Sequence, residues 1–260
     1  ANIWRPKSLT PALMISIGLT QTLLIALALV EGAIHNELAR ADAGEIPNFF
    51  FIDIPKAQTQ AFADFVSAEA PGARIEHVPM KRGRIIAVKD TPVDRIAVAD
   101  DAKWALEGDR GVTFSSALPA NSTLAEGEWW PANYAGPPLV SLVGEIAKGL
   151  GIGIGDSITV NVLGREITAK VANLREVNWR SLGINFVMVF SPNTLKSAPH
   201  SHIVTVEMTG GDEAKLLNAA AQSFPSVTAV RVKDAIGIVS DLLGKMLLAI
   251  RGASSLTLFT

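Results

Sequence analysis

A glycine-rich stretch in the middle of the chain is the first candidate for chemistry. Residues 150–164 read LGIGIGDSITVNVLG, and glycine-rich loops of this kind often cradle phosphates. A dinucleotide fingerprint places its glycines after a strand and before a helix, and a P-loop needs Gly-Lys-Ser/Thr after them. Here the glycines end a predicted helix over 145–150 and lead through Gly-Asp-Ser into a strand pattern of period two. The stretch therefore predicts a helix C-cap at Gly149 or Gly151 and a Gly-Asp turn after it, with no nucleotide site.

Two further sets of side chains could do chemistry. His200 and His202 stand two residues apart, hence on one strand face, as some metal ligands do, yet no third ligand with suggestive spacing accompanies them. We expect a surface pair near the start of a strand. Asp53 ends the segment FFFIDI and could be a catalytic carboxylate, although such a residue more often ends a strand or caps a turn. The sequence has no nucleophile elbow, zinc-protease helix or EF-hand motif, so we expect a non-catalytic protein without a metal or cofactor.

An aromatic cluster is the main candidate for a contact surface. Trp129, Trp130 and Tyr134 lie close together in the sequence, and they could touch a partner, a lipid or a substrate. The alternative is a loop packed onto the neighbouring strands. The basic run KRGR, from Lys81 to Arg84, is expected to be a solvated strand edge.

The composition indicates that part of the chain does not face water. The 260 residues are 48% hydrophobic and 18% charged, whereas a typical soluble domain has about 25% charged residues. The net charge of −2 provides no basic field for nucleic acid, and the absence of cysteine excludes disulfides, thiolate metal sites and a cysteine nucleophile.

The apolar excess is concentrated near the start of the chain. Residues 11–30, PALMISIGLTQTLLIALALV, carry no charge, and as a helix they would span roughly 30 Å, the thickness of a bilayer core. We expect a retained transmembrane helix, the alternative being a cleaved signal peptide, whose apolar core is shorter. Arg5 and Lys7 precede the segment, and positive residues favour the cytoplasmic side. Residues 1–10 are therefore expected to be a cytoplasmic flank and residues 31–233 to lie outside the cytoplasm.

The other end of the chain shows a second helical pattern. Apolar residues recur at helical spacing from Ile236 to Ile250, with Asp241 and Lys245 on the opposite face, and the last residues are apolar. Residues 234–260 are expected to form a stalk helix and the start of a truncated second transmembrane helix.

The segment between the two apolar ends is predicted to be an α+β domain. A strand, a helix and two extended segments appear early, and a strand, a helix and a returning strand appear late. The early elements are predicted at 49–54, 56–70 and 74–88, and the late ones at 202–209, 212–224 and 227–234. Between them lie the aromatic loop, a predicted helix over 139–151 and a long predicted hairpin over 156–174. We therefore expect two βαβ units with a mostly β insertion.

Several of these segments resemble the FtsX/MacB-like ABC transporter permeases, specifically the YbbP-like branch. LGIGIGDSITV followed by a hairpin is shared widely across the superfamily, whereas EGEWWP (126–131) and NWRSLGINFVMVFSP (178–192) look more specific to the branch. FFFIDI after the first apolar segment, PMKRGRIIAV (79–88) and AIRGASSLTL (249–258) match as well. The resemblance covers nearly all of the chain.

The resemblance implies a MacB-like periplasmic core domain between two transmembrane helices of a bacterial inner-membrane protein, with a porter-like βαβ part and an inserted β part. It also implies a separate cytoplasmic ATPase as partner, contact with membrane lipid, and a second permease copy. Family members act as mechanotransmitters or extruders. The YbbP-like branch tends to accompany an extracytoplasmic esterase, which implies a hydrophobic or lipid-like substrate. We therefore expect a permease fragment that couples ATP hydrolysis in its partner to movement of its outer domain, for export or extraction of that substrate.

Two other functions fit the same order of segments. A ligand-sensing ectodomain of a membrane receptor also lies between two spans and would carry a ligand pocket. A membrane-anchored hydrolase would need a nucleophile–base pair, which the sequence does not offer.

Overall fold

The computed structural model describes the central part of the chain almost without a break. The described residues are 46–179, 182–196 and 199–238, with shorter pieces at 14–15, 18–19, 21–23, 25–26, 28–30, 32–33, 36, 241–242 and 244–246. The chain divides into two compact units, residues 1–48 with 230–260 and residues 49–229. Most of the elements below belong to the second unit.

The two apolar ends are described only in part. All described residues between 14 and 36 are helical, as are residues 232–238 and the short pieces up to residue 246. The rest of the predicted span 11–30 and of the predicted stalk 234–260 lies outside the described residues. Among the residues that are described, no helix is both long enough and apolar enough to cross a membrane.

The first sheet, which we call the helix-covered sheet, has the strand order β11-β1-β10-β2. β1 and β2 both run antiparallel to β10, so they are parallel to each other with β10 between them. The elements are β1 (Phe49–Pro55), α2 (Thr59–Glu69), β2 (Arg74–Val88), β10 (Ser201–Glu207), α5 (Glu213–Ser223) and β11 (Thr228–Arg231). The two predicted strand–helix–strand units are thus present, and they interleave, because β10 lies between β1 and β2 while β1 lies between β11 and β10.

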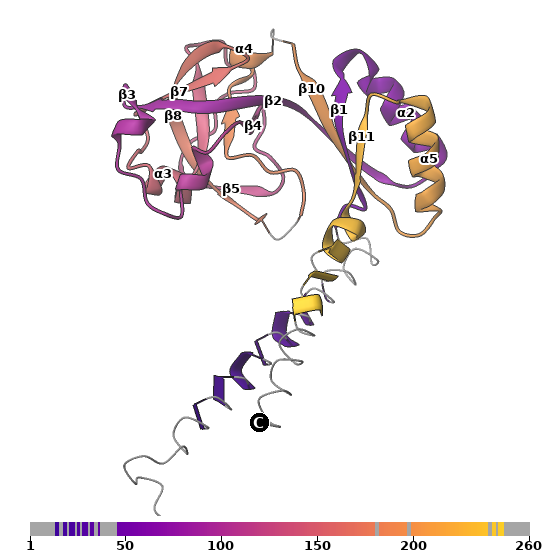
Figure 1. The fold of residues 1–260 in the computed structure, drawn as a ribbon. Coiled ribbons are helices and arrows are strands. Elements are labelled where there is room, and N and C mark those ends of the chain that lie inside the picture. The colour runs from indigo at the N-terminus through magenta and orange to yellow at the C-terminus, as the bar shows by residue number, and fades with distance from the viewer. Residues whose placement is uncertain are drawn as a thin grey trace, which may run out of the picture. The chain divides into compact units, whose positions relative to one another are not determined.

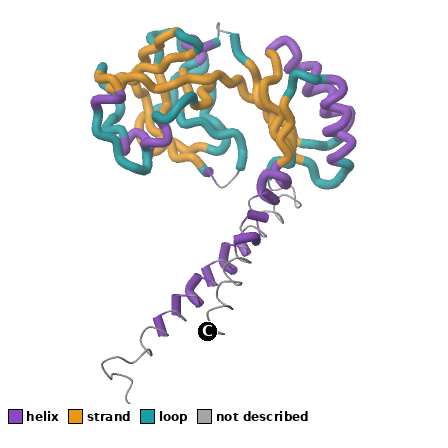
Figure 2. The backbone as a smooth tube through the Cα atoms, viewed as in Figure 1, coloured by secondary structure: helices purple, strands orange, loops and turns teal. Residues whose placement is uncertain are grey.

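α2 and α5 lie together on one face of this sheet (Figures 1 and 2). Phenylalanine rings fill the space between helices and strands: the ring of Phe62 lies 4.9 Å from that of Phe51 and 5.1 Å from that of Phe224, measured between centroids. Lys215 Nζ of α5 also pairs with Glu69 Oε2 of α2 at 3.1 Å. α2 therefore packs on the sheet through the face that carries Phe62.

Local sequence sets the ends of these helices. Asp212 precedes α5, and its side chain accepts a hydrogen bond from the backbone N–H of Lys215 at 3.0 Å, which makes it an N-cap. α2 ends at Glu69, and the chain then turns at Pro71 and Gly72, where the glycine takes the left-handed backbone with φ +84°.

β2 is a single strand of 15 residues, where the sequence predicted two extended segments. Its first half pairs with β10, whereas its second half pairs with β4 (Arg110–Phe114) and β7 (Ser157–Val162) in a second sheet. Figure 1 shows β2 passing through both sheets. The strand therefore connects the two parts of the fold.

The prediction that KRGR forms a solvated strand edge is wrong, because the run lies where β2 changes partners. Lys81 is only 5% exposed, and its Nζ donates to the carbonyl of Pro199 at 2.6 Å. Burial lowers the pKa of Lys81. A Cβ added at Gly83 would lie 3.0 Å from Val160 and 3.1 Å from Val162, so glycine is what allows β7 to pack this closely.

The second sheet, which we call the strand ring, closes on itself. Its pairings run β2-β4-β9-β6-β8-β7 and back to β2. Closure satisfies the backbone groups that an open sheet edge would leave unpaired. The remaining ring strands are β6 (Leu139–Val143), β8 (Arg165–Val177) and β9 (Met188–Phe190), and β5 (Ser122–Gly127) and β3 (Thr91–Pro92) are added to β8 and β2. Short helices accompany it: α3 (Gly144–Gly149), α4 (Pro192–Leu195) and the 3₁₀ turns Val93–Arg95 and Lys103–Ala105, with Lys56–Gln58 before α2.

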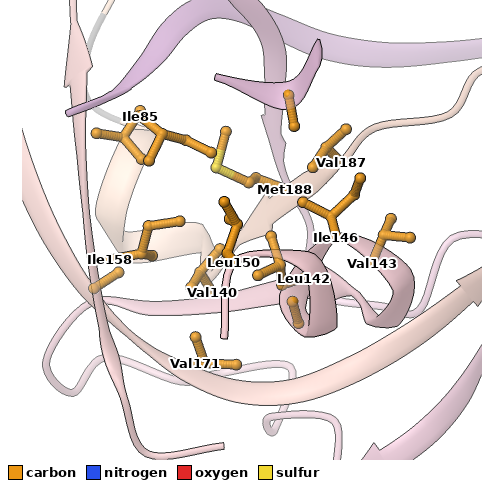
Figure 3. Close-up of a cluster of buried hydrophobic side chains, with 14 of the residues drawn as sticks. Ile85, Val140, Leu142, Val143, Ile146, Leu150, Ile158, Val171, Val187 and Met188 are labelled. Atoms are coloured by element: carbon orange, nitrogen blue, oxygen red, sulfur yellow. The ribbon is translucent and has the colours of Figure 1, made fainter. Parts of the chain in front are cut away.

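Aliphatic side chains fill the strand ring. Figure 3 shows Ile85, Leu142, Ile158 and Met188 in one cluster. All four are at most 1% exposed. α3 adds Ile146 to the same core.

The helix predicted over 139–151 is wrong in its first half. Residues 139–143 form β6, which lies between β8 and β9, and only Gly144–Gly149 are helical. LVSLV is a short, mostly buried apolar run, which periodicity alone does not distinguish from a buried helix. The predicted hairpin is confirmed as β7 and β8, and its two-residue turn places Leu163 and Gly164 at φ +53° and +83°.

Candidate functional site

The glycine-rich stretch is a structural turn, as predicted. Gly151 and Gly155 take left-handed backbone with φ +66° and +91° between the end of α3 and the start of β7. Asp156 closes the turn, because its Oδ2 accepts from the backbone N–H of Gly153 at 2.8 Å and pairs with Lys89 Nζ at 3.1 Å. The bond from Gly153, followed by that from Lys89, lowers the pKa of Asp156. The backbone N–H of Gly153 thus donates to a side chain of the same loop, as is typical of a turn.

The predicted contact loop packs against the protein with its polar groups paired. Trp130 is 5% exposed, and its Nε1 donates to the carbonyl of Ser115 at 2.9 Å. Trp129 Nε1 donates to the carbonyl of Ser116 at 3.1 Å, and the centroids of the two indoles lie 4.2 Å apart. The hydroxyl of Tyr134 donates to a backbone carbonyl at 2.8 Å. The loop thus has the packed geometry of the alternative interpretation, and contact of its partly exposed rings with a partner or substrate stays a prediction.

The two predicted histidines belong to a cluster of three. The ring centroid of His202 lies 5.3 Å from that of His200 and 6.0 Å from that of His77. His202 is partly buried rather than on the surface, and its Nδ1 is buried without a hydrogen-bond partner among the described residues. Burial, followed by the charges of His200, His77 and Lys56, lowers the pKa of His202 to about 4. In the part of the chain that the structure describes, no three His, Cys, Asp or Glu residues are placed to hold a metal ion.

Asp53 lies in a β-bulge of β1. The pairing of β1 with β10 shifts register between Phe51 and Ile54, and Asp53 has φ +64°. Aspartate is among the residues that tolerate this backbone region. Its side chain is exposed, and β1 continues past it to Pro55. Asp53 therefore has a structural role at the bulge, where the strand bends.

Arg175 is a functional candidate that the sequence analysis missed. It is 1% exposed, and burial lowers its pKa to about 10. Its Nε donates to Ser141 Oγ at 2.8 Å, and Nη1 donates to Ser122 Oγ at 2.9 Å. Its Nη2 donates to the carbonyls of Phe186 and Val187 at 2.9 and 3.3 Å. One guanidinium therefore links β5, β6 and β8 to the segment that leads into β9.

The alternation of β8 gave no clean signal for this residue. Ala169 and Val171 point into the aliphatic core, but a register shift between Val171 and Asn173 then changes the side of the strand that faces it, so that Leu174 joins that core. Arg175 is buried on the other face of the strand, where a charged residue would not be expected from the sequence pattern.

A small apolar pocket is a further candidate site, and its lining differs from the structural residues described above. Its volume is about 270 Å³, and it lies within the 49–229 unit. Buried Ile184 and Phe186 line it together with the exposed indoles of Trp104 and Trp179 and the side chain of Arg110. None of these residues was predicted to be part of a site. Trp179, Ile184 and Phe186 nevertheless lie in the segment NWRSLGINFVMVFSP, which carries the family resemblance.

Comparison with known proteins adds a relative. No family model matches the chain. The chain is 26% identical over 213 residues to the uncharacterized ABC transporter permease YbbP of Escherichia coli (strain K12). The chain is a relative of this permease. The match covers 82% of the chain and 25% of the permease, so the chain spans about a quarter of the length of this relative. The resemblance drawn from the sequence motifs is confirmed.

Two solved structures are also similar to the chain. The periplasmic region of MacB from Actinobacillus actinomycetemcomitans has a TM-score of 0.38 and 10% identity, over 78% of this chain and 94% of that one. A domain from Porphyromonas gingivalis, of a protein named as a permease, has a TM-score of 0.33 and 13% identity, over 64% of this chain and 74% of that one.

Proposed function

We propose that the chain is part of a non-catalytic permease subunit of an ABC transporter in a bacterial inner membrane. The similarity to the YbbP permease over 213 residues is the observation that carries this proposal. In it, residues 1–10 are a cytoplasmic flank, 11–30 a transmembrane helix, 31–233 a periplasmic core domain, and 234–260 a stalk helix with the start of a second span.

The partners in this proposal follow from the permease relationship. A separate cytoplasmic ATPase hydrolyses ATP, and the permease passes the resulting movement to its outer domain to export or extract a hydrophobic or lipid-like substrate. The turn geometry of residues 150–156 supports the assignment of nucleotide chemistry to another subunit. A second permease copy, membrane lipid and an extracytoplasmic esterase complete the proposed assembly.

One backbone hydrogen bond supports mechanical coupling. Asn48 immediately precedes β1, Val232 immediately follows β11, and the N–H of Val232 donates to the carbonyl of Asn48 at 2.9 Å. Both residues are buried, at 4% and 6% exposure. The segments that lead into and out of the domain are therefore tied together at one point. A displacement of either flanking helix would reach both segments through this junction.

Val232→Pro tests the junction, because proline removes the donor N–H. Residue 232 begins a helix, where proline is tolerated. In proteoliposomes that hold the full-length permease and its ATPase, we expect substrate-stimulated ATP hydrolysis to fall several-fold, as loss of about 1 kcal/mol of hydrogen-bond energy implies. Val232→Ala is the matched control, since it loses side-chain packing but keeps the N–H, and it should retain most of the stimulation. Equal activity of the two variants would contradict coupling through this bond.

A ligand-sensing ectodomain is the second candidate function, and the pocket near Trp104 is the observation that favours it. The two functions differ in partner. A permease should co-purify with an ABC ATPase from gently solubilised membranes, and its presence should change the rate of ATP hydrolysis. Recovery of the full-length protein with a signalling module and without an ATPase would favour the sensor.

A further inference from the structure

The pocket of about 270 Å³ has a buried floor and an exposed aromatic rim. Ile184 and Phe186 form the floor and are 6% and 8% exposed. Trp104 and Trp179 form the rim and are 39% and 43% exposed, with their rings in an edge-to-face contact at 6.4 Å between centroids. Two indoles facing water beside an apolar floor are typical of a binding site rather than of a surface without function.

Among the described residues that line the pocket, one cation, Arg110, lies at this rim. The guanidinium carbon of Arg110 stands 5.2 Å from the centroid of the Trp104 ring, a cation–π contact, and Nη2 donates to the Trp104 carbonyl. Its Nε is buried without a hydrogen-bond partner among the described residues. Nearby Arg84 shows the contrast, because its Nη2 pairs with Asp109 at 3.1 Å, whereas none of the ion pairs within the described residues involves Arg110. The positive charge at the pocket is therefore held in place, and no ion pair among the described residues neutralises it.

We propose that this pocket binds the apolar chain of a single-chain anionic amphiphile, with its negative headgroup on Arg110. The apolar floor and the indoles match an aliphatic chain, and the arginine matches a carboxylate or phosphate. The volume lies at the small end of ligand pockets, so it holds one chain and not the two chains of a membrane phospholipid. Compared with the proposed function, the pocket further specifies that the substrate is anionic and has one aliphatic chain. This inference rests on that function for the side of the membrane on which binding takes place.

The test is photo-crosslinking of the full 260-residue chain in phosphatidylcholine nanodiscs. The probe is decanoate that carries a diazirine at its far end, and labelled residues are mapped by mass spectrometry. We expect label at Trp104, Trp179 and residues 183–187. Unlabelled decanoate should compete at least about tenfold better than decylamine of equal chain length, because the amine brings a like charge to Arg110.

Arg110→Gln should abolish the preference for decanoate over decylamine while the label stays in the pocket. Arg84→Gln is the matched control, since it removes an exposed arginine from the neighbouring strand β2, and the preference should be unchanged. Trp104→Leu keeps an apolar rim and should lower the affinity less than Trp104→Ala does. Shortening the competitor from ten to eight carbons should weaken competition roughly fourfold for each methylene that leaves the apolar floor.

Two headgroups distinguish the sources of the anion. Competition by decanoate but not by decyl phosphate would assign the pocket to free fatty acids, and the reverse would assign it to single-chain phospholipids; either result supports the charge requirement. Label confined to residues 1–48 and 230–260, or a preference that Arg110→Gln leaves intact, would overturn the proposal. Because the assay contains no ATPase, failure of transport would leave a positive binding result standing, and failure of binding would leave the permease assignment standing.

Discussion

The helix-covered sheet and the strand ring are stabilised in different ways. In the sheet, phenylalanines such as Phe51, Phe62 and Phe224 pack between two helices and one sheet face, and its outermost strand β11 is only four residues long. In the ring, the backbone ladder closes on itself, and Arg175 adds four hydrogen bonds that link β8 to β5, β6 and the segment before β9. The pocket draws on both regions, because Ile184 and Phe186 lie in the segment before β9 whereas Phe50 and Ile203 belong to β1 and β10. The difference indicates a ring that is braced by hydrogen bonds and a sheet that relies on apolar packing.

The largest expected effect comes from the sheet. Phe62→Ala removes a fully buried ring that touches Phe51 and Phe224, and it should cost roughly 3–5 kcal/mol of the free energy of unfolding. Urea denaturation measures the loss. Phe65→Ala is the matched control, because Phe65 lies on the same helix but is only partly buried, and its cost should be clearly smaller.

Hydrogen exchange on the Phe62→Ala variant sharpens the comparison. If the two regions are stabilised separately, amides of α2 and α5 should lose protection while those of β8 keep it. Equal loss of protection in β8 would show that the sheet and the ring unfold as one cooperative unit, and the contrast drawn above would fail.

The next effect belongs to the ring. Arg175→Met keeps the volume approximately but leaves Ser122, Ser141 and two backbone carbonyls without their donor. We expect a loss of about 3 kcal/mol in the free energy of unfolding, because buried groups that lose a charged partner retain their desolvation cost. Arg82→Met, an exposed arginine on β2, should change stability by no more than about 0.5 kcal/mol. A stability equal to that of the unchanged protein would show that the guanidinium bonds do not brace the ring.

The sheet was more predictable from the sequence than the ring, and the reason is the range of the signals. In the sheet, the start of α5 at Asp212 is a local signal, since a cap depends on adjacent residues. In the ring, the two-residue turn at Leu163-Gly164 is local in the same way and predicted the hairpin, but it does not specify the other pairings. β6 was mistaken for a helix because its burial is set by β8 and β9, which lie later in the chain. The elements of the sheet could therefore be predicted from local periodicity, whereas most elements of the ring depend on pairings between distant segments.

The candidate site shows the same limit more strongly. Trp129 and Trp130 were predicted to form a contact surface because they are adjacent in the sequence. In the structure, their indole N–H groups donate to backbone carbonyls of the protein itself. The pocket brings Trp104 and Arg110 together with Trp179, about seventy residues later in the chain. No motif spacing predicts this arrangement, because segments that are distant in the sequence come together only in the folded chain.

The smallest expected effect is a pH dependence that belongs to the sheet. Burial, with the charges of His200 and His77 as further causes, lowers the pKa of His202 from 6.5 to about 4, so folding favours the neutral ring. The unfolded chain then binds more protons between these two values, and stability should be complete above pH 6.5 and fall as the pH decreases toward 4. Because His202 is only partly buried, solvent screening reduces the loss to about 1 kcal/mol. Urea midpoints measured from pH 7.5 to 4 should show this slope, and His202→Gln should flatten it while Arg175→Met leaves it in place. A slope that survives in His202→Gln would assign the titration to another group and remove this distinction between the sheet and the ring.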